Sequence, residues 1–118
     1  MVKNKRAIGA EKESLAADYL VREGYTLLEH NFCCRTGEID LVAKEGNYLV
    51  FVEVKYRAGR QFGVPEEAVT AAKQRSIIRT AQVYLLQKSI PESTPCRFDV
   101  LAIEGEEIRL IKNAFEII

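Results

Sequence analysis

Residues 37–55 constrain the fold most strongly, because they form two apolar segments around a short turn. Residues 38–43 indicate one strand, and residues 48–54, rich in β-branched and aromatic side chains, indicate its partner. The turn at 45–47 favours a hairpin, since Gly and Asn tolerate the positive φ of tight loops. A core strand would carry Val or Leu throughout, yet three charged residues lie within these segments: Asp40, Glu53 and Lys55.

The length of the turn decides whether the two carboxylates meet. Side chains alternate between the faces of a strand, so Glu53 and Lys55 share one face. A two-residue loop, at 45–46 or 46–47, places Asp40 on that face, directly opposite Glu53 or diagonal to it. A three-residue loop would separate them. Adjacent carboxylates repel each other, which raises a pKa, and a hard divalent cation such as Mg²⁺ removes that repulsion.

Length and composition predict one domain, residues 1–118, with enough apolar residues to bury a core. The chain has no long uncharged run, so no membrane span is expected, and no apolar segment follows the basic N-terminus as a signal peptide requires. Cys33 and Cys34 are neighbours on a predicted strand and point apart, and Cys96 is distant. We therefore expect reduced thiols and a cytoplasmic location.

The net charge is zero, but basic residues are concentrated in one half of the chain. Residues 54–91 contain seven Lys and Arg against two Glu. Such a local basic face can hold phosphates although the total charge is neutral. Residues 56–63 form a basic, glycine-bearing loop that either lies beside a substrate or is a plain connector.

The remaining elements are two helices and three strands. A first helix is expected over about 9–23, ended by Gly24, and a strand over 25–34. Glu13 lies on the flank of that helix, where it is either a third carboxylate of the site or an ordinary first-turn Glu. His30 has no second ligand nearby in the sequence and is interpreted as a surface or packing residue.

The second helix is predicted to begin at Pro65 and run to about Gln87. Gln74 lies near the centre of its apolar stripe, Lys73 at the edge, and Arg75 and Arg79 face outward. Strands follow over 97–103 and 108–111. The first of these is expected to run parallel to the strand over 48–54, because a helix separates the two.

Asp40 followed by Glu53-Val54-Lys55 resembles the signature of the PD-(D/E)XK nuclease superfamily, in which Asp and Glu bind metal and Lys assists the attacking water. Longer segments resemble the YraN-like family of uncharacterised bacterial proteins, and these are Glu13-x-x-Ala16-Ala17-x-x-Leu20, Gly37-Glu38-Ile39-Asp40-Leu41, Phe51-Val52-Glu53-Val54-Lys55, Lys73, Arg97-Phe98-Asp99-Val100 and Asn113-Ala114-Phe115.

The resemblance implies an α/β fold with a restriction-endonuclease-like core, a mixed five-stranded sheet flanked by helices in the order α-β-β-β-α-β-β. It maps Glu13 onto a nuclease position together with Asp40, Glu53 and Lys55, and suggests Gln74 or Lys73 as a further polar group. Two residues depart from the related proteins: Lys12 replaces a usual Gly and would either crowd substrate or face water, and Ile78 replaces a Tyr found in some of them.

The sequence thus predicts a metal-dependent DNA endonuclease that hydrolyses phosphodiester bonds, possible substrates being branched or damaged DNA. Mg²⁺ or Mn²⁺ would be held by Asp40, Glu53 and Glu13, with Lys55 and Gln74 as further catalytic groups. The expected DNA contacts are Arg57, Arg60, Lys73, Arg75 and Arg79. The resemblance to dimeric resolvases implies a homodimer.

Two other interpretations remain open. One is a non-catalytic nucleic-acid-binding module with a vestigial nuclease site. The other is a structural or protein-interaction domain, in which the charges form an exposed strand face with a Glu53–Lys55 salt bridge.

Overall fold

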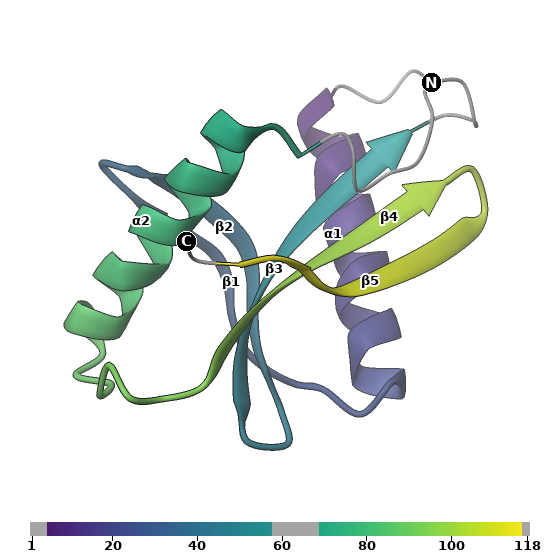
Figure 1. Cartoon of the computed structure of the whole chain (residues 1–118). Coiled ribbons are helices and arrows are strands. Elements are labelled where there is room, and N and C mark those ends of the chain that lie inside the picture. The colour runs from purple at the N-terminus through teal and green to yellow at the C-terminus, as the bar shows by residue number, and fades with distance from the viewer. Residues whose placement is uncertain (1–4, 58–68, 117–118) are drawn as a thin grey trace.

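The computed structural model describes residues 5–57 and 69–116, in which five strands form one mixed sheet with a helix on each face (Figure 1). The elements in chain order are α1 (Lys5–Arg22), β1 (Thr26–Cys34), β2 (Gly37–Glu45), β3 (Tyr48–Arg57), α2 (Ala71–Gln87), β4 (Cys96–Glu104) and β5 (Glu107–Phe115). This is the α/β order that the sequence predicts.

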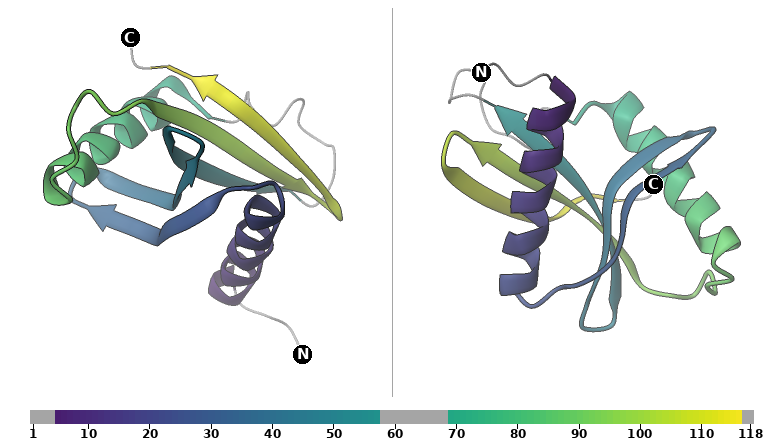
Figure 2. Two further views of the ribbon diagram at one scale, coloured as in Figure 1. Left: turned by 90° about the horizontal axis from the view of Figure 1, so that it is seen from below. Right: turned by 180° about the vertical axis from the view of Figure 1, so that it is seen from behind.

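The strands lie in the sheet in the order in which they occur in the chain. β3 and β4 are parallel, while every other neighbouring pair is antiparallel. A parallel pair needs a long crossover connection, and α2 lies within it, as predicted. Two further views show α1 and α2 on opposite sides of the twisted sheet (Figure 2).

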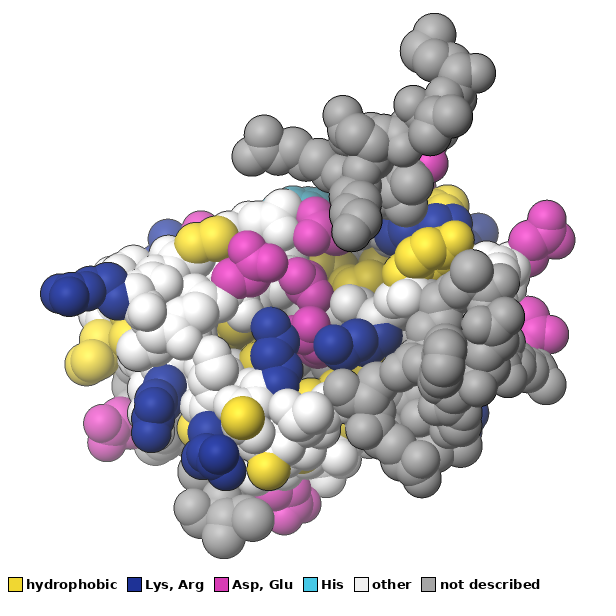
Figure 3. Space-filling view, turned by 90° about the horizontal axis from the view of Figure 1, so that it is seen from above, with side chains coloured by type: hydrophobic (Ala, Val, Ile, Leu, Met, Phe, Trp, Pro, Cys, Tyr) yellow, Lys and Arg dark blue, Asp and Glu magenta, His cyan; other side chains and the backbone are white. Residues whose placement is uncertain are grey.

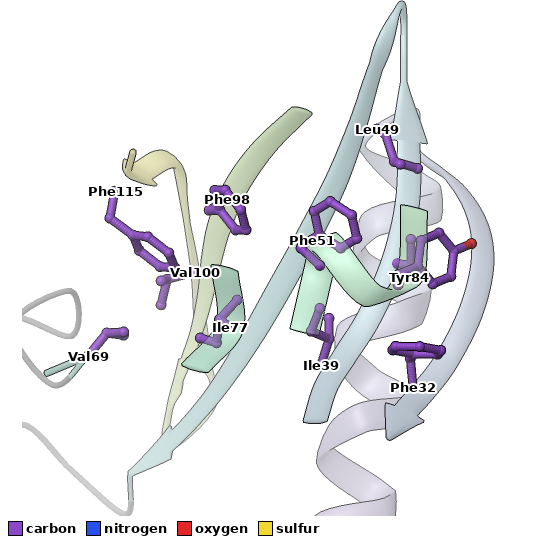
Figure 4. Close-up of a cluster of buried hydrophobic side chains, with 12 residues drawn as sticks. Phe32, Ile39, Leu49, Phe51, Val69, Ile77, Tyr84, Phe98, Val100 and Phe115 are labelled. Atoms are coloured by element: carbon purple, nitrogen blue, oxygen red, sulfur yellow. The ribbon is translucent and has the colours of Figure 1, made fainter. Parts of the chain in front are cut away.

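The core has two layers, one under each helix. The layer under α2 contains five aromatic rings in sequential contact (Figure 4). Their centroids are 5.1 Å apart for Phe32 and Tyr84, 5.7 Å for Tyr84 and Phe51, 5.6 Å for Phe51 and Phe98, and 5.0 Å for Phe98 and Phe115. The layer under α1 is aliphatic except for Tyr25, and includes Leu20, Leu41 and Leu101. The sheet is therefore fixed from both sides.

The second helix begins six residues later than the sequence predicts. Thr70 has an extended backbone, and its side chain accepts a hydrogen bond from the Lys73 N–H at 3.1 Å. It is thus an N-cap, which satisfies one of the free N–H groups of the first turn. Residues 65–68, where the helix was expected to begin, lie outside the described residues.

The last strand extends further than expected, to Phe115, and is attached to β4 by Asp99. Asp99 has no exposed surface, and it accepts hydrogen bonds from the Tyr25 hydroxyl, the Arg97 guanidinium and the Asn113 N–H, all at 2.8–2.9 Å. Asn113 has a φ of 54° and lies beside the irregularity in the β4–β5 pairing. A buried carboxylate with this many donors is a structural anchor.

Candidate active site

The β2–β3 turn has two residues, Gly46 and Asn47, because Glu45 pairs with Tyr48. The same register continues to the pair Leu41–Val52. Continued one step beyond this last pair, the register would put Asp40 across from Glu53, and the charge of Asp40 does act on Glu53. Of the loops considered, the two-residue loop at 46–47 is confirmed.

Asp40 lies at the point where the two strands stop pairing. The paired residues of β2 and β3 run only from Glu45–Tyr48 to Leu41–Val52. Beyond them, the Asp40 carboxylate Oδ2 accepts the Val54 N–H at 2.8 Å. The carboxylate thus takes the place of a main-chain acceptor and holds the separating strands at a fixed distance.

Both carboxyls are nearly buried, with 9 % of Asp40 and 8 % of Glu53 exposed. Burial, followed by the charge of Asp40, raises the pKa of Glu53 to about 7 from its ordinary 4.5. A hydrogen bond between the two carboxyls acts in the same direction. The pKa of Asp40 is also raised, chiefly by burial, while its bond from Val54 opposes the shift. Ionisation of both carboxyls at once is therefore unfavourable.

Two lysines flank the pair. Lys55 Nζ lies 3.9 Å from Glu53 Oε1, and the charges of Lys55 and of Lys73, on α2, lower the pKa of Glu53. Lys73 also lowers the pKa of Asp40. The Glu53–Lys55 ion pair of the third interpretation is present, but Glu53 is nearly buried. It does not belong to an exposed strand face.

Glu13 faces the sheet from α1, as its position on the flank of the helix predicts. Its charge raises the pKa of Asp40. The Glu13 carboxylate Oε2 accepts a hydrogen bond from Asn31 Nδ2 at 2.9 Å. Asn31 lies between His30 and Phe32, which pair with the two neighbours of Asp40, and it has a φ of 51°, which Asn tolerates better than most residues.

Sequence reasoning missed two polar neighbours of the pair. One is Asn31, which the sequence does not distinguish from the polar Glu29 and His30 before it on the same strand. The other is Glu38, whose charge also raises the pKa of Asp40 and whose Oε2 lies 3.3 Å from Cys33 Sγ. The thiol of Cys33 is free, as are those of Cys34 and Cys96.

The carboxylates of this site suit a cation that takes only a few of its ligands from the protein. Within the described ranges, no group of three or more His, Cys, Asp and Glu side chains is arranged to hold a metal ion. Mg²⁺ is often bound by one or two carboxylates, with water and substrate phosphates completing its shell. The paired carboxyls of Asp40 and Glu53, whose mutual repulsion a cation would relieve, fit that requirement.

The structure describes both alternatives for the further polar group. Gln74 Nε2 donates to the Val69 carbonyl at 3.0 Å. Gln74 also lines a surface cavity of about 420 Å³ between α2 and the end of β5, with Ala71, Arg75, Ile78, Arg79, Gln82 and Glu116. Lys73 is the residue of the two whose charge acts on both carboxyls. Lys73 therefore acts electrostatically on the site, while Gln74, a neutral amide, stays a predicted further polar group.

The structure describes only some of the residues that are predicted to contact DNA. Arg75 and Arg79 are exposed on α2. Arg60 and the side chain of Arg57 lie outside the described part of the structure. Acidic and basic side chains meet on the face seen from above Figure 1, near its middle (Figure 3). None of the described helices is long and apolar enough to span a membrane.

Comparisons with known proteins place the whole arrangement in one family. The model of the "Uncharacterised protein family UPF0102" matches residues 12–103, which include all the site residues named above. A UPF0102 protein of Lachnoclostridium phytofermentans is 59 % identical over 113 residues, 96 % of either chain. One of Symbiobacterium thermophilum is 50 % identical over 115 residues, 93 % of this chain and 97 % of the relative. One of Clostridium botulinum is 46 % identical over 116 residues, 93 % and 94 % of the two chains. The chain therefore belongs to the UPF0102, or YraN-like, family.

Proposed function

We propose that this protein is a Mg²⁺- or Mn²⁺-dependent nuclease that hydrolyses phosphodiester bonds in DNA. The observation that carries the proposal is the nearly buried pair of Asp40 and Glu53, which act on each other just beyond the last β2–β3 pair. Two carboxyls with raised pKa values destabilise the metal-free protein. A divalent cation would remove that penalty.

Asp40 and Glu53 would hold the cation, with Glu13 as a third or water-mediated ligand. When bound, the metal would lower the pKa of a water molecule and neutralise charge on the phosphate. Lys55, 28 % exposed and beside Glu53, would orient the attacking water and stabilise the developing negative charge. Lys73 would hold the phosphate from α2.

The proposed substrate is DNA, with branched or damaged forms as the preferred class by resemblance to the resolvases. Arg75 and Arg79 would contact phosphates flanking the scissile one, since both are exposed on the helix that carries Lys73. The same resemblance supports a homodimer as the active assembly.

The second candidate is a nucleic-acid-binding module with a vestigial nuclease site. It is favoured by one observation: the Glu13 carboxylate is already engaged by the Asn31 amide. Such a module would bind DNA through Arg75 and Arg79 without cutting it.

One experiment distinguishes the two. Purified protein is incubated with linear duplex, single-stranded and branched DNA, each with Mg²⁺, Mn²⁺ or EDTA, and Mn²⁺ binding is measured by calorimetry. The parent should bind Mn²⁺ and cut at least one DNA form. Asp40→Asn should lose both properties, while Glu92→Gln, at an exposed carboxylate outside the site, should keep both. If the parent neither binds metal nor cuts any DNA, the binding module replaces the nuclease.

A further inference from the structure

An exposed tyrosine follows the candidate active site along β3. Tyr56 follows Lys55 on β3, and 44 % of its surface is exposed. Lys12 Nζ, from α1, lies 4.5 Å from the centroid of the Tyr56 ring. Lys12 thus lies over an aromatic ring.

Both elements connect this pair directly to the carboxylate site. On β3, Tyr56 is three residues beyond Glu53, which corresponds to about 10 Å along the strand. On α1, Lys12 directly precedes Glu13, the residue whose charge acts on Asp40. Consecutive side chains of a strand alternate between its faces, so Tyr56 lies on the α1 side of the sheet while Lys55 and Glu53 lie on the other. The ring therefore lies further along β3 than the carboxylate pair and on the α1 side of the sheet, the side from which Glu13 acts on Asp40.

The chemistry of the pair fits an unpaired nucleobase. An aromatic ring offers a stacking surface to any base, and a neighbouring cation adds an attraction to the phosphate backbone. Bases inside a duplex already stack on one another, so they are available to a protein ring only when unpaired or extruded.

We propose that Tyr56 and Lys12 form a stacking platform for an unpaired base next to the scissile phosphate. The substrate class is then nucleic acid with a single-stranded segment or an extruded base at the cleavage point. That this base is next to the scissile phosphate rests on the proposed function. The stacking of a base on Tyr56 can be measured without any cleavage.

The chain offers a matched control for Tyr56. Tyr48, at the opposite end of the same strand, is 45 % exposed, and the Arg97 guanidinium carbon lies 5.3 Å from its ring centroid. Tyr48 thus has the same exposure and a cation of its own, but it lies near the β2–β3 turn, five residues from Glu53. If any exposed tyrosine bound nucleic acid non-specifically, replacing either residue would weaken binding equally.

The test uses a single-stranded oligonucleotide carrying 2-aminopurine, titrated with protein in EDTA so that no metal acts, and a duplex of the same sequence. Tyr56→Ala should weaken single-strand binding by on the order of 10-fold and abolish the stacking-dependent quenching of 2-aminopurine. Duplex binding should change less than about twofold, because it depends on phosphate contacts. Tyr56→Phe and Tyr48→Ala should behave as the parent does.

Three outcomes would overturn the platform: no single-strand binding by the parent, a Tyr56→Ala variant within about twofold of the parent on the single strand, or an equal loss in Tyr48→Ala. Tyr56→Leu repeats the test with an apolar side chain in place, which guards against a folding defect. Failure of the nuclease proposal is separate, since Asp40→Asn should abolish cleavage yet keep the single-strand affinity measured in EDTA. A stacking signal without cleavage by the parent would retain the platform and support the binding module.

Discussion

Replacing Glu53 by Gln should raise the free energy of unfolding at pH 8 and leave it near the parent's value at pH 5. In the folded protein the pKa of Glu53 is about 7, against 4.5 for the ordinary carboxyl. Between these values the folded state keeps a proton that the unfolded state has lost. The stability of the parent therefore falls as the pH rises from about 4.5 to about 7 and stays low above it. Gln is neutral at every pH, so Glu53→Gln does not lose stability in this way.

The magnitude follows from the size of the shift. A rise from 4.5 to about 7 corresponds to about 3 kcal/mol, since a tenfold change in a proton equilibrium is worth about 1.4 kcal/mol. Glu53 is only 8 % exposed, so solvent screens little of this energy. The pKa of Asp40 is raised as well, and the titration belongs to the pair rather than to one residue.

Urea unfolding of both proteins in EDTA, at intervals from pH 5 to pH 8, measures the difference directly. Glu45→Gln provides a control of opposite sign. Bonds from Lys112 and Arg97 lower the pKa of Glu45 from its ordinary 4.5, so this variant should be less stable than the parent by an amount that stays constant from pH 5 to pH 8 and shrinks only in stronger acid. Mn²⁺ at pH 8 should stabilise the parent and not Glu53→Gln. A difference between parent and Glu53→Gln that is constant from pH 5 to pH 8 would refute the reasoning.

Three further outcomes follow from the structure. Lys55→Ala should keep or slightly tighten Mn²⁺ binding in calorimetry while cleavage falls by on the order of 10²–10³-fold, whereas a mere salt bridge predicts equal, small effects on both. Replacing Arg75 and Arg79 by Ala should lower the log–log salt slope of duplex binding by about 0.9 for each lost phosphate contact, as fluorescence anisotropy would show, and an unchanged slope removes this face of α2 from the interface. Asp99→Asn should cost on the order of 3 kcal/mol in urea unfolding, because it removes the buried carboxylate partner of the Arg97 guanidinium and leaves Arg97 its less buried ion pair with Glu45.

Strand alternation explains why the position of the carboxyl pair could be predicted. With side chains repeating every two residues, the loop length alone determines whether Asp40 and Glu53 share a face, and the Gly46-Asn47 turn is a two-residue loop. The parallel β4 could be predicted in the same way, because the long helix before it excludes a tight turn. Both inferences rest on local periodicity, which a sequence displays directly.

Features that depend on individual side-chain hydrogen bonds could not be predicted. Asn31 reaches Glu13 across 18 residues, and only the left-handed backbone of Asn31 reveals this arrangement. The start of α2 was misplaced because Pro65 is a good first-turn residue, whereas the observed cap depends on the side chain of Thr70. Helix periodicity placed Gln74 towards the interior, but its amide bonds to the nearby Val69 carbonyl.

The charge of Asp40 is the feature that the fold itself does not require. Its structural task is to accept the Val54 N–H, and the amide oxygen of an Asn would accept that bond without a buried charge. Asp40→Asn should therefore fold and, in EDTA at pH 8, be more stable than the parent. A penalty of about 3 kcal/mol at the neighbouring Glu53 is a large part of the 5–15 kcal/mol that stabilises a typical domain. Such a cost is typical of functional sites, where stability is sacrificed for chemistry. If Asp40→Asn is less stable than the parent in EDTA at pH 8, the carboxylate is structural and the site loses its electrostatic argument.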